Sequence, residues 1–157
     1  MFKFNLKVFL KTSNEIILVI FQFLIITLHF IKFEFINKIE IIKGNSILSF
    51  LGFIIIIIGS IIMFFAIKDL GSNLSPLPRP KVNGNLITSG IYRFFRHPMY
   101  YSLILISMGV FIIKLSFYYL FLTISLALII KLKIILEEKY LNKKFKNYFI
   151  YTDKVKY

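Results

Sequence analysis

The feature that most constrains this chain is an uncharged, mostly apolar stretch from Ile47 to Ile67, whose centre reads Phe53-Ile54-Ile55-Ile56-Ile57-Ile58. An α-helix needs about 20 such residues to cross the hydrocarbon core of a bilayer, because each residue advances it by only about 1.5 Å. This stretch meets that length. It therefore predicts a transmembrane helix and a fold organised by a membrane.

Three further apolar segments run from about Ile16 to Ile31, from Tyr100 to Ile113, and from Leu115 to about Leu132. The last two are separated only by Lys114. One continuous helix over both would be longer than an ordinary bilayer needs. We therefore expect an all-α integral membrane protein with about four transmembrane helices, the last two forming a helical hairpin with Lys114 at its tip.

Composition and charge support a membrane protein. The 157 residues are 58% hydrophobic, and 20 Lys and Arg against 7 Asp and Glu give a net charge of +13. The cations lie beside apolar segments and not in a separate polar domain, which indicates contact with anionic lipids and no nucleic-acid partner. There is no Cys, and the two histidines, His29 and His97, are far apart, so the sequence indicates neither a disulfide nor a metal centre.

The distribution of cations predicts the orientation in the membrane. Lys and Arg are concentrated at 3–11, 68–96 and 131–156. Cytosolic loops carry such an excess, so both termini are expected in the cytosol. No small-residue cleavage site follows the first apolar segment, which is expected to remain as an anchor.

The organisation is that of one domain over 1–157, with two transmembrane helices in 1–67 and the remaining elements in 68–157. The latter part begins with a loop in which Pro76, Pro78 and Pro80 favour a stiff, extended backbone. It continues through the hairpin. From Glu137 to Tyr157 we expect a basic, amphipathic helix lying partly in the membrane interface.

The first candidate site is Arg96-His97-Pro98, directly before the third apolar segment. Pro98 suits the first turn of a helix, where its missing N–H costs nothing. The free N–H groups of such a turn bind anions, and Arg96 and His97 add donors beside them. Taken alone, Arg96-His97-Pro98 is better explained as a topology anchor followed by a helix start.

The second candidate is Glu137-Glu138, an unusual carboxylate pair in so basic a chain. It could bind a cation, or an amino or hydroxyl group of a ligand. Lys133 lies four residues earlier on the same helix face. Taken alone, Lys133 and Glu137 are better explained as a surface ion pair worth a few tenths of a kcal/mol.

Several other polar or small residues have structural explanations. His29, with Gln22 and Thr27, is expected to serve helix packing or helix–helix hydrogen bonding and not to bind a ligand. Asp69 is expected at a solvated helix end. Gly52 and Gly59 are seven residues apart on roughly one helix face, which indicates close helix packing.

Together, the two candidates form a more specific pattern. The string G-x-Y-x-x-x-R-H-P-x-Y over 90–100, followed after an apolar hairpin by E-E-x-x-L over 137–141, resembles the isoprenylcysteine carboxyl methyltransferase family. It is also similar to phospholipid N-methyltransferases. The upstream run from Leu74 to Pro80 matches a stretch seen in bacterial members. The resemblance covers about residues 68–156.

The resemblance implies an S-adenosyl-L-methionine-dependent membrane methyltransferase. Its members hold the cofactor in a cytosolic pocket closed over by the C-terminal segment, and a lipophilic small-molecule or lipidated substrate enters laterally from the bilayer. The implied cofactor contacts are Gly84, Asn85, Leu86, Ile87, Tyr92, Arg96, His97, Pro98, Met99, Tyr100 and Glu137. Lys133 falls where members can have a substrate-facing Arg, and it lacks the bidentate fork of that residue.

The cofactor groups suit these residues. Arg96 and a helix start suit its carboxylate, Glu137 suits its amine or ribose hydroxyls, and Tyr92 or Tyr100 suits its adenine or sulfonium. The acceptor stays open between a carboxylate, including a prenyl-type one, and a lipid amine. No catalytic base and no oligomeric state is assigned.

Two other functions remain open at this point. Sterol reductases, which bind NADPH, share a similar R-H-P-x-Y run, although Glu137-Glu138 fits the methyltransferases better. The ending at Tyr157 differs from the basic residue and Ile-Pro with which relatives usually finish. That difference leaves room for a non-enzymatic small membrane protein.

Overall fold

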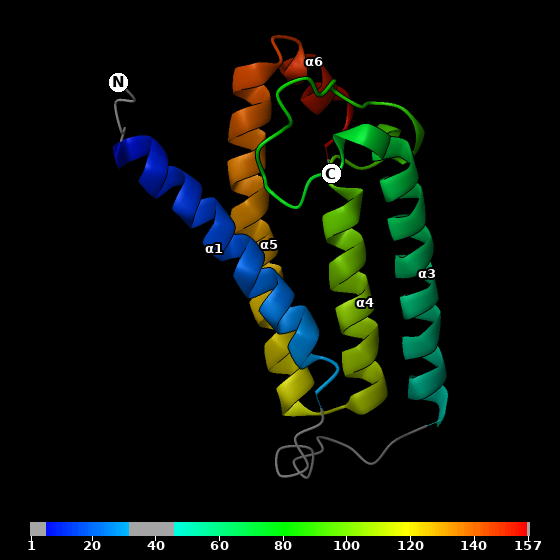
Figure 1. The fold of residues 1–157 in the computed structure, drawn as a ribbon. Coiled ribbons are helices and arrows are strands. Elements are labelled where there is room, and N and C mark those ends of the chain that lie inside the picture. Colours follow the sequence, from blue (N-terminus) through cyan, green and yellow to red (C-terminus); the bar gives the residue numbers. More distant parts are fainter. Residues whose placement is uncertain (1–5, 32–45, 157) are drawn as a thin grey trace.

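The computed structural model describes residues 6–31 and 46–156, with side chains from Glu15 onward. Every regular element within these residues is helical, so the predicted all-α class is confirmed for them (Figure 1). The elements are α1 (Leu6–Leu28), α3 (Ser46–Leu70), η1 (Gly71–Asn73), η2 (Gly90–Arg93), α4 (Pro98–Lys114), α5 (Phe117–Lys144) and α6 (Tyr148–Lys154).

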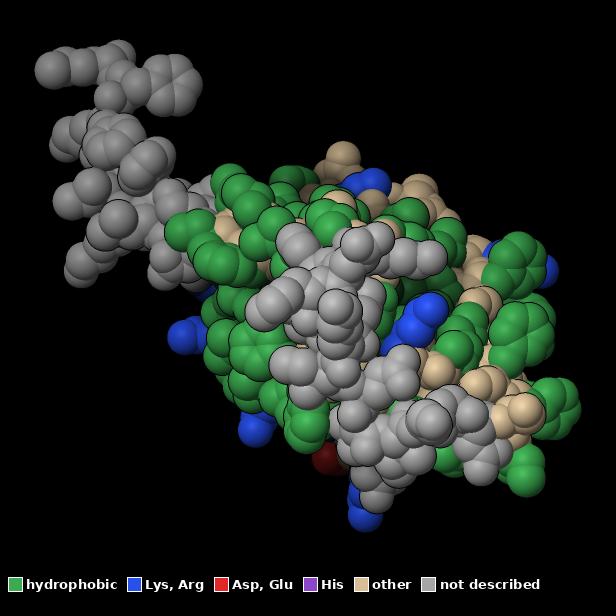
Figure 2. All heavy atoms as spheres, turned by 90° about the horizontal axis from the view of Figure 1, so that it is seen from below, with side chains coloured by type: hydrophobic (Ala, Val, Ile, Leu, Met, Phe, Trp, Pro, Cys, Tyr) green, Lys and Arg blue, Asp and Glu red, His purple; other side chains and the backbone are tan. Residues whose placement is uncertain are grey.

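Two of these helical stretches, over 46–73 and 117–144, are long and apolar enough to cross a membrane. Shorter apolar helices cover Glu15–Leu28 and Pro98–Lys114. Many large hydrophobic side chains point outward, among them Phe50 and Phe64 of α3. Hydrophobic side chains also dominate the described surface at the end opposite the 71–97 loop (Figure 2). The count of four spans and the cytosolic termini stay predictions.

Helices α3 and α4 pack with their backbones in close approach. A Cβ atom added to Gly52 would lie 2.8 Å from the carbonyl oxygen of Gly109, and one added to Gly59 would lie 2.9 Å from Cγ1 of Ile106. Such distances leave no space for any side chain. Small residues of this kind let helices associate closely in a membrane. The close packing predicted for Gly52 and Gly59 is therefore confirmed.

The predicted hairpin is also confirmed. Helices α4 and α5 run antiparallel (Figure 1), and the turn between them consists of Leu115 and Ser116, directly after the exposed Lys114. Leu115 takes the left-handed conformation, with φ of 43°, and ends α4. The Ser116 hydroxyl accepts a hydrogen bond from the backbone N–H of Tyr118 and so caps the start of α5.

Helix α1 crosses α5, and buried apolar side chains hold the two together (Figure 1). The buried cluster consists of Ile25, Tyr119, Leu122, Leu126 and Ile130. At the end of α1, His29 Nε2 lies 2.7 Å from the Ser107 hydroxyl of α4, and Ser107 bonds Thr123 of α5 at 2.8 Å. The predicted helix–helix hydrogen bonding by His29 is confirmed.

The prediction of one helix from Glu137 to Tyr157 is wrong. Helix α5 continues without interruption through Glu137 to Lys144, since no Gly or Pro interrupts it. The chain then turns at Phe145, and α6 folds back. Tyr148, Tyr151 and Val155 are buried against Leu86, Leu141 and Phe145. The aromatic residues of the C-terminal segment therefore cover the loop, although Phe149 and Ile150 remain exposed.

Candidate functional site

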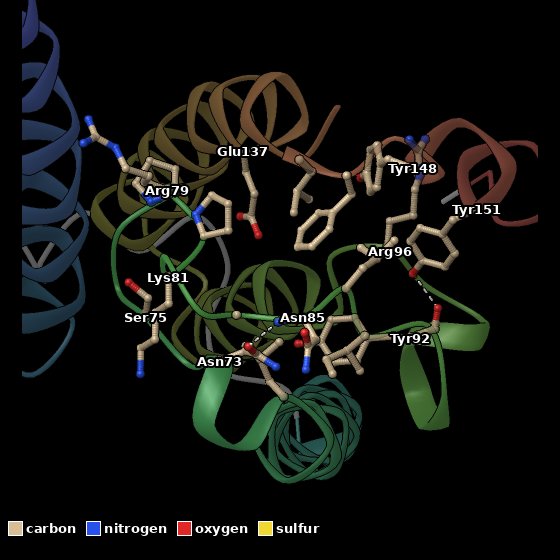
Figure 3. Close-up of a pocket in the computed structure, with 18 of the residues that line it drawn as sticks. Asn73, Ser75, Arg79, Lys81, Asn85, Tyr92, Arg96, Glu137, Tyr148 and Tyr151 are labelled. Carbon is tan, nitrogen blue, oxygen red and sulfur yellow. Dashed lines mark hydrogen bonds between the residues drawn. The ribbon is translucent and has the colours of Figure 1, made fainter. Parts of the chain in front are cut away.

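The candidate site lies at the end of the bundle where the loop over 71–97 meets the ends of α3, α4 and α5 (Figures 1 and 3). Its main cavity has about 630 Å³ of free space, including its opening to solvent. Figure 3 shows Glu137 of α5 pointing into this cavity, with Asn73 and Asn85 across from it and Tyr148 and Tyr151 at one side.

Polar side chains from the helix ends hold the loop in place. Asp69 Oδ2 accepts from the backbone N–H of Ile91 at 2.7 Å, and Asn73 Oδ1 accepts from that of Asn85 at 3.0 Å. The ammonium group of Lys144 donates to the carbonyl oxygen of Gly84 at 2.8 Å and also to that of Lys81. The loop therefore has a defined position although it contains little secondary structure.

The expectation that Asp69 is a solvated helix end is wrong, because Asp69 fixes the start of η2. Sequence reasoning also missed Asn73 and Lys144. For Asp69 and Asn73, the available signal was that two hydrogen-bonding side chains lie four residues apart at the end of an apolar helix. Nothing local to Lys144 distinguishes it from the neighbouring lysines.

Two glycines are required by this arrangement. Gly90 has φ of +60°, and a Cβ atom there would lie 2.0 Å from Asp69 Oδ2. A Cβ atom at Gly84 would lie 2.7 Å from Asn73 Oδ1. The loop backbone can approach Asp69 and Asn73 only because neither position carries a side chain.

Glu138 joins the two halves of the sequence pattern. His97 Nε2 donates to Glu138 Oε1 at 2.7 Å, and Arg96 Nη1 donates to the same oxygen at 3.1 Å. Arg96 Nη2 also donates to the carbonyl oxygen of Lys156 at 2.8 Å. These bonds link the start of α4, the end of α5 and the C-terminal segment. The sequence pattern indicates Glu138 only as part of the carboxylate pair and predicts no separate role for it.

Glu137 is directed differently from Glu138. One of its carboxylate oxygens lies 4.0 Å from His97 Nδ1, and the side chain lines the main cavity. It also lines a smaller adjoining cavity of about 350 Å³, with Tyr92, Arg96, His97, Met99 and Tyr100 among its other walls. The ring of His97 stacks on that of Tyr100 with centroids 5.8 Å apart.

The two cavities together bring most of the predicted cofactor residues into one place. The main cavity has Gly84, Asn85, Leu86, Ile87, Tyr92, Arg96 and Glu137 in its wall, and the smaller one adds His97, Met99 and Tyr100. Pro98 lines neither cavity and is buried in the first turn of α4. Within the described part of the chain, Arg96 Nε is buried without a hydrogen-bond partner. It is a donor available to a ligand.

Two buried tyrosines give the cavity neutral walls. Burial raises the pKa of Tyr151 from its ordinary value near 10 to about 12. Burial and, next, the nearby Glu137 carboxylate raise the pKa of Tyr92 above its ordinary value. Tyr151 donates to the carbonyl oxygen of Tyr92 at 2.5 Å. At neutral pH both phenols therefore act as hydrogen-bond donors and not as bases.

Lys133 is not the surface residue that its spacing from Glu137 favoured. It is buried because α1 and the proline-rich loop cover it, and its ammonium group donates to Gln22 Oε1 at 2.5 Å and to the Pro76 carbonyl oxygen at 3.0 Å. The same nitrogen lies 5.1 Å from the ring centre of Tyr100. Lys133 therefore stands behind Tyr100 and lines neither of the two cavities.

A second set of residues absent from the sequence-based prediction centres on Glu15 of α1. Glu15 is 1% exposed, and its Oε1 accepts from Arg79 Nη2 at 3.1 Å and from the Tyr140 hydroxyl. These contacts tie α1 to the loop and to α5. The signal was present, since Glu15 is an isolated acidic residue beside an apolar segment in a basic chain.

The fold and site define a helical membrane protein with a polar cavity at one end of its bundle. The family model for phospholipid methyltransferases matches residues 47–148, which include the loop, the hairpin and both halves of the motif. The chain therefore belongs to the phospholipid methyltransferase family, which includes the isoprenylcysteine carboxyl methyltransferases. Comparison with curated proteins gave no significant match. The family points to a membrane methyltransferase for lipid-type substrates.

Proposed function

We propose that this protein transfers a methyl group from S-adenosylmethionine to a lipophilic acceptor, a carboxylate or a lipid amine, at the cytosolic face of a bacterial cytoplasmic membrane. The observation that carries the proposal is the junction at Glu138. It holds the two motif halves around one cavity, within the region that matches the family. In this proposal α1, α3, α4 and α5 cross the membrane, and the single domain has its cation-rich end in the cytosol.

The donor set fits the cofactor. Arg96 Nε and the first turn of α4 suit the carboxylate of S-adenosylmethionine, and the Glu137 carboxylate in the cavity wall suits its amine or ribose hydroxyls. Tyr92 and Tyr100 offer aromatic surface for the adenine or the sulfonium. The bound cofactor would supply an electrophilic methyl group.

The residues of the chain would contribute mainly position and exclusion of water. Methyl transfer is a displacement in line, so holding the two reactants in the right geometry supplies much of the acceleration. Arg96, His97 and Glu138 fix the relative position of α4 and α5 in the cavity wall. Tyr148 and Tyr151 of α6 shield the cavity from solvent. A carboxylate acceptor needs no base, and the neutral tyrosines supply none.

Lys133 is proposed to act on the substrate side. A cation held beneath the ring of Tyr100 would favour an anionic acceptor approaching from the membrane. Its ammonium group donates to Gln22 and Pro76, so it would influence the acceptor through its charge across the Tyr100 ring and not by direct contact.

Calorimetry on the purified protein in nanodiscs tests the proposal. We expect the wild type to bind S-adenosylmethionine and not NADPH. Glu137→Gln and His97→Ala should each weaken binding by at least about tenfold, which corresponds to the loss of one charged hydrogen bond. Asp153→Asn removes an exposed carboxylate from α6 and is the matched control.

Binding of NADPH alone would indicate a reductase instead of a methyltransferase. Binding of neither ligand would indicate a non-enzymatic protein. The acceptor is identified separately. Membranes containing the protein are incubated with methyl-labelled cofactor, and the labelled product is extracted with the lipids. Base-labile label would identify a methyl ester, and base-stable label a methylated amine.

A further inference from the structure

A second hollow lies on the outer side of the cavity wall. It is an open groove with about 1200 Å³ of free space, including its mouth. Its lining residues are Leu86, Thr88, Arg93, Asn147, Ile150, Tyr151, Lys154 and Val155. Leu86 and Tyr151 also line the main cavity, so they form a wall between the two spaces.

The groove lies at the level where the membrane helices end. Tyr151 bonds the Tyr92 carbonyl, and the Lys156 carbonyl accepts from Arg96, so α6 is held beside η2 and the start of α4. Just beyond η2, the ring of Phe95 packs edge-on against Tyr101 in the first turn of α4, at 6.3 Å. This is the depth at which lipid headgroups meet a membrane protein.

The groove is cationic. Arg93 of η2 and Lys154 of α6 bring positive charge to it from two separate elements, and both side chains are exposed. Within residues 15–31 and 46–156, neither forms an ion pair with an acidic side chain. Asp153 is next to Lys154 but does not line the groove. Two unpaired cations, with Thr88 and Asn147 as hydrogen-bonding neighbours, suit a phosphate group.

The surroundings of the groove are apolar. Phe94 is 66% exposed, Phe149 57% and Ile150 44%, and Ile150 itself lines the groove. Aromatic and aliphatic side chains exposed at this depth fit acyl chains better than water. The combination of two neighbouring cations and apolar edges matches a molecule that carries both an anionic headgroup and a hydrocarbon chain.

We propose that this groove binds an anionic phospholipid of the surrounding leaflet, as a site separate from the cofactor and acceptor cavity. The bound lipid would brace Leu86 and Tyr151 and so support the wall of the candidate cofactor site. The binding itself does not depend on the proposed methyltransferase activity, whereas this supporting effect rests on it.

Native mass spectrometry of the purified protein with added phosphatidylglycerol tests the binding, with phosphatidylcholine of the same chains as comparison. Arg93→Gln/Lys154→Gln should lower phosphatidylglycerol affinity by about tenfold or more and leave phosphatidylcholine unaffected. Lys68→Gln/Lys139→Gln is the control, because it removes the same charge from exposed positions outside the groove. Arg93→Lys/Lys154→Arg should retain the lipid.

Equal losses in the groove variant and in the control would overturn the proposal in favour of general surface charge. Competition by inorganic phosphate at concentrations similar to those of the lipid would overturn it in favour of a free-anion site. Lipid binding is measured without cofactor. The protein can therefore bind the lipid and not S-adenosylmethionine, or bind S-adenosylmethionine and not the lipid, and the two proposals are tested separately. Where both are found, phosphatidylglycerol should tighten S-adenosylmethionine binding in the wild type and not in the groove variant.

Discussion

The α3–α4 helix pair and the loop end of the molecule are held together by different forces. Along the helices, Gly52, Gly59 and Gly109 bring two backbones into contact, and the cohesion comes from close packing. At the loop end, the cohesion comes from side chains that bond backbone atoms or charges far away in the sequence, such as Asp69 to Ile91. The first region makes a rigid support, and the second makes the candidate site on it.

This difference predicts that substitutions in the two regions affect different measurements. A change in the helix pair should act first on the stability of the whole protein. A change in the loop network should act first on ligand affinity, because the loop is positioned by a few bonds whose loss leaves the helices intact. The following substitutions test that distinction.

The largest loss of stability is expected from Gly109→Leu. A Cβ atom at this position would lie 2.6 Å from Ile56 Cγ1 and 2.7 Å from the Gly52 carbonyl oxygen. Forcing a side chain into this contact should lower the free energy of unfolding by about 3 kcal/mol. Denaturation in mixed micelles measures it. Gly71→Asn is the control, since a Cβ atom there meets nothing within 4 Å and Asn tolerates its positive φ.

Glu138→Gln should have a somewhat smaller effect on stability and a larger one on the site. It removes the charge that His97 and Arg96 share, at a cost of about 2 kcal/mol for charged hydrogen bonds. We expect S-adenosylmethionine affinity to fall by at least about tenfold because the first turn of α4 and the end of α5 lose their connection. Unchanged affinity would show that the junction does not position the cavity wall.

Asn73→Ala should act mainly on affinity. The substitution removes the acceptor for the Asn85 N–H and should release the Gly84–Ile87 segment from the end of α3. One hydrogen bond of about 1 kcal/mol corresponds to roughly fivefold in the dissociation constant of the cofactor. Asn142→Ala, at an exposed position on α5 whose side chain donates to the Glu138 carbonyl oxygen of the same helix, should leave that constant unaltered.

The effect expected from the titration of Tyr151 is confined to high pH. Its pKa is raised from near 10 to about 12 in the folded protein, so its contribution to stability is complete below pH 10 and is lost as the pH rises through 12. The stability difference between wild type and Tyr151→Phe should therefore shrink between pH 10 and 12. A constant difference over that interval would contradict the raised pKa.

The same comparison explains what the sequence could predict. The helices were predictable because long apolar stretches have few alternatives in a membrane, and Lys114 marked the hairpin turn between two of them. The close packing at Gly52 and Gly59 was predictable because the small residues recur on one helix face. These features depend on residues that are near one another in the chain.

The loop network could not be predicted in the same way. Glu15 acquires its role from Tyr140, which is 125 positions away, and Asn73 acquires its role from the backbone of Asn85. Lys133 looked like half of a surface pair because its cover comes from Gln22 and Pro76, on other elements. For the pair Glu137-Glu138, the sequence showed two carboxylates but not which one turns inward to the cavity and which one binds His97.

The junction between His97 and Glu138 has a consequence for how the protein is made. The two residues are 41 positions apart, at opposite ends of the α4–α5 hairpin. In the proposed arrangement both helices cross the membrane, and a nascent chain that had inserted α4 but not α5 would carry only half of the pocket. A hairpin whose second helix failed to return would then leave Glu138 on the wrong side of the bilayer. Ligand binding would thus report that α5 had been inserted in the correct direction.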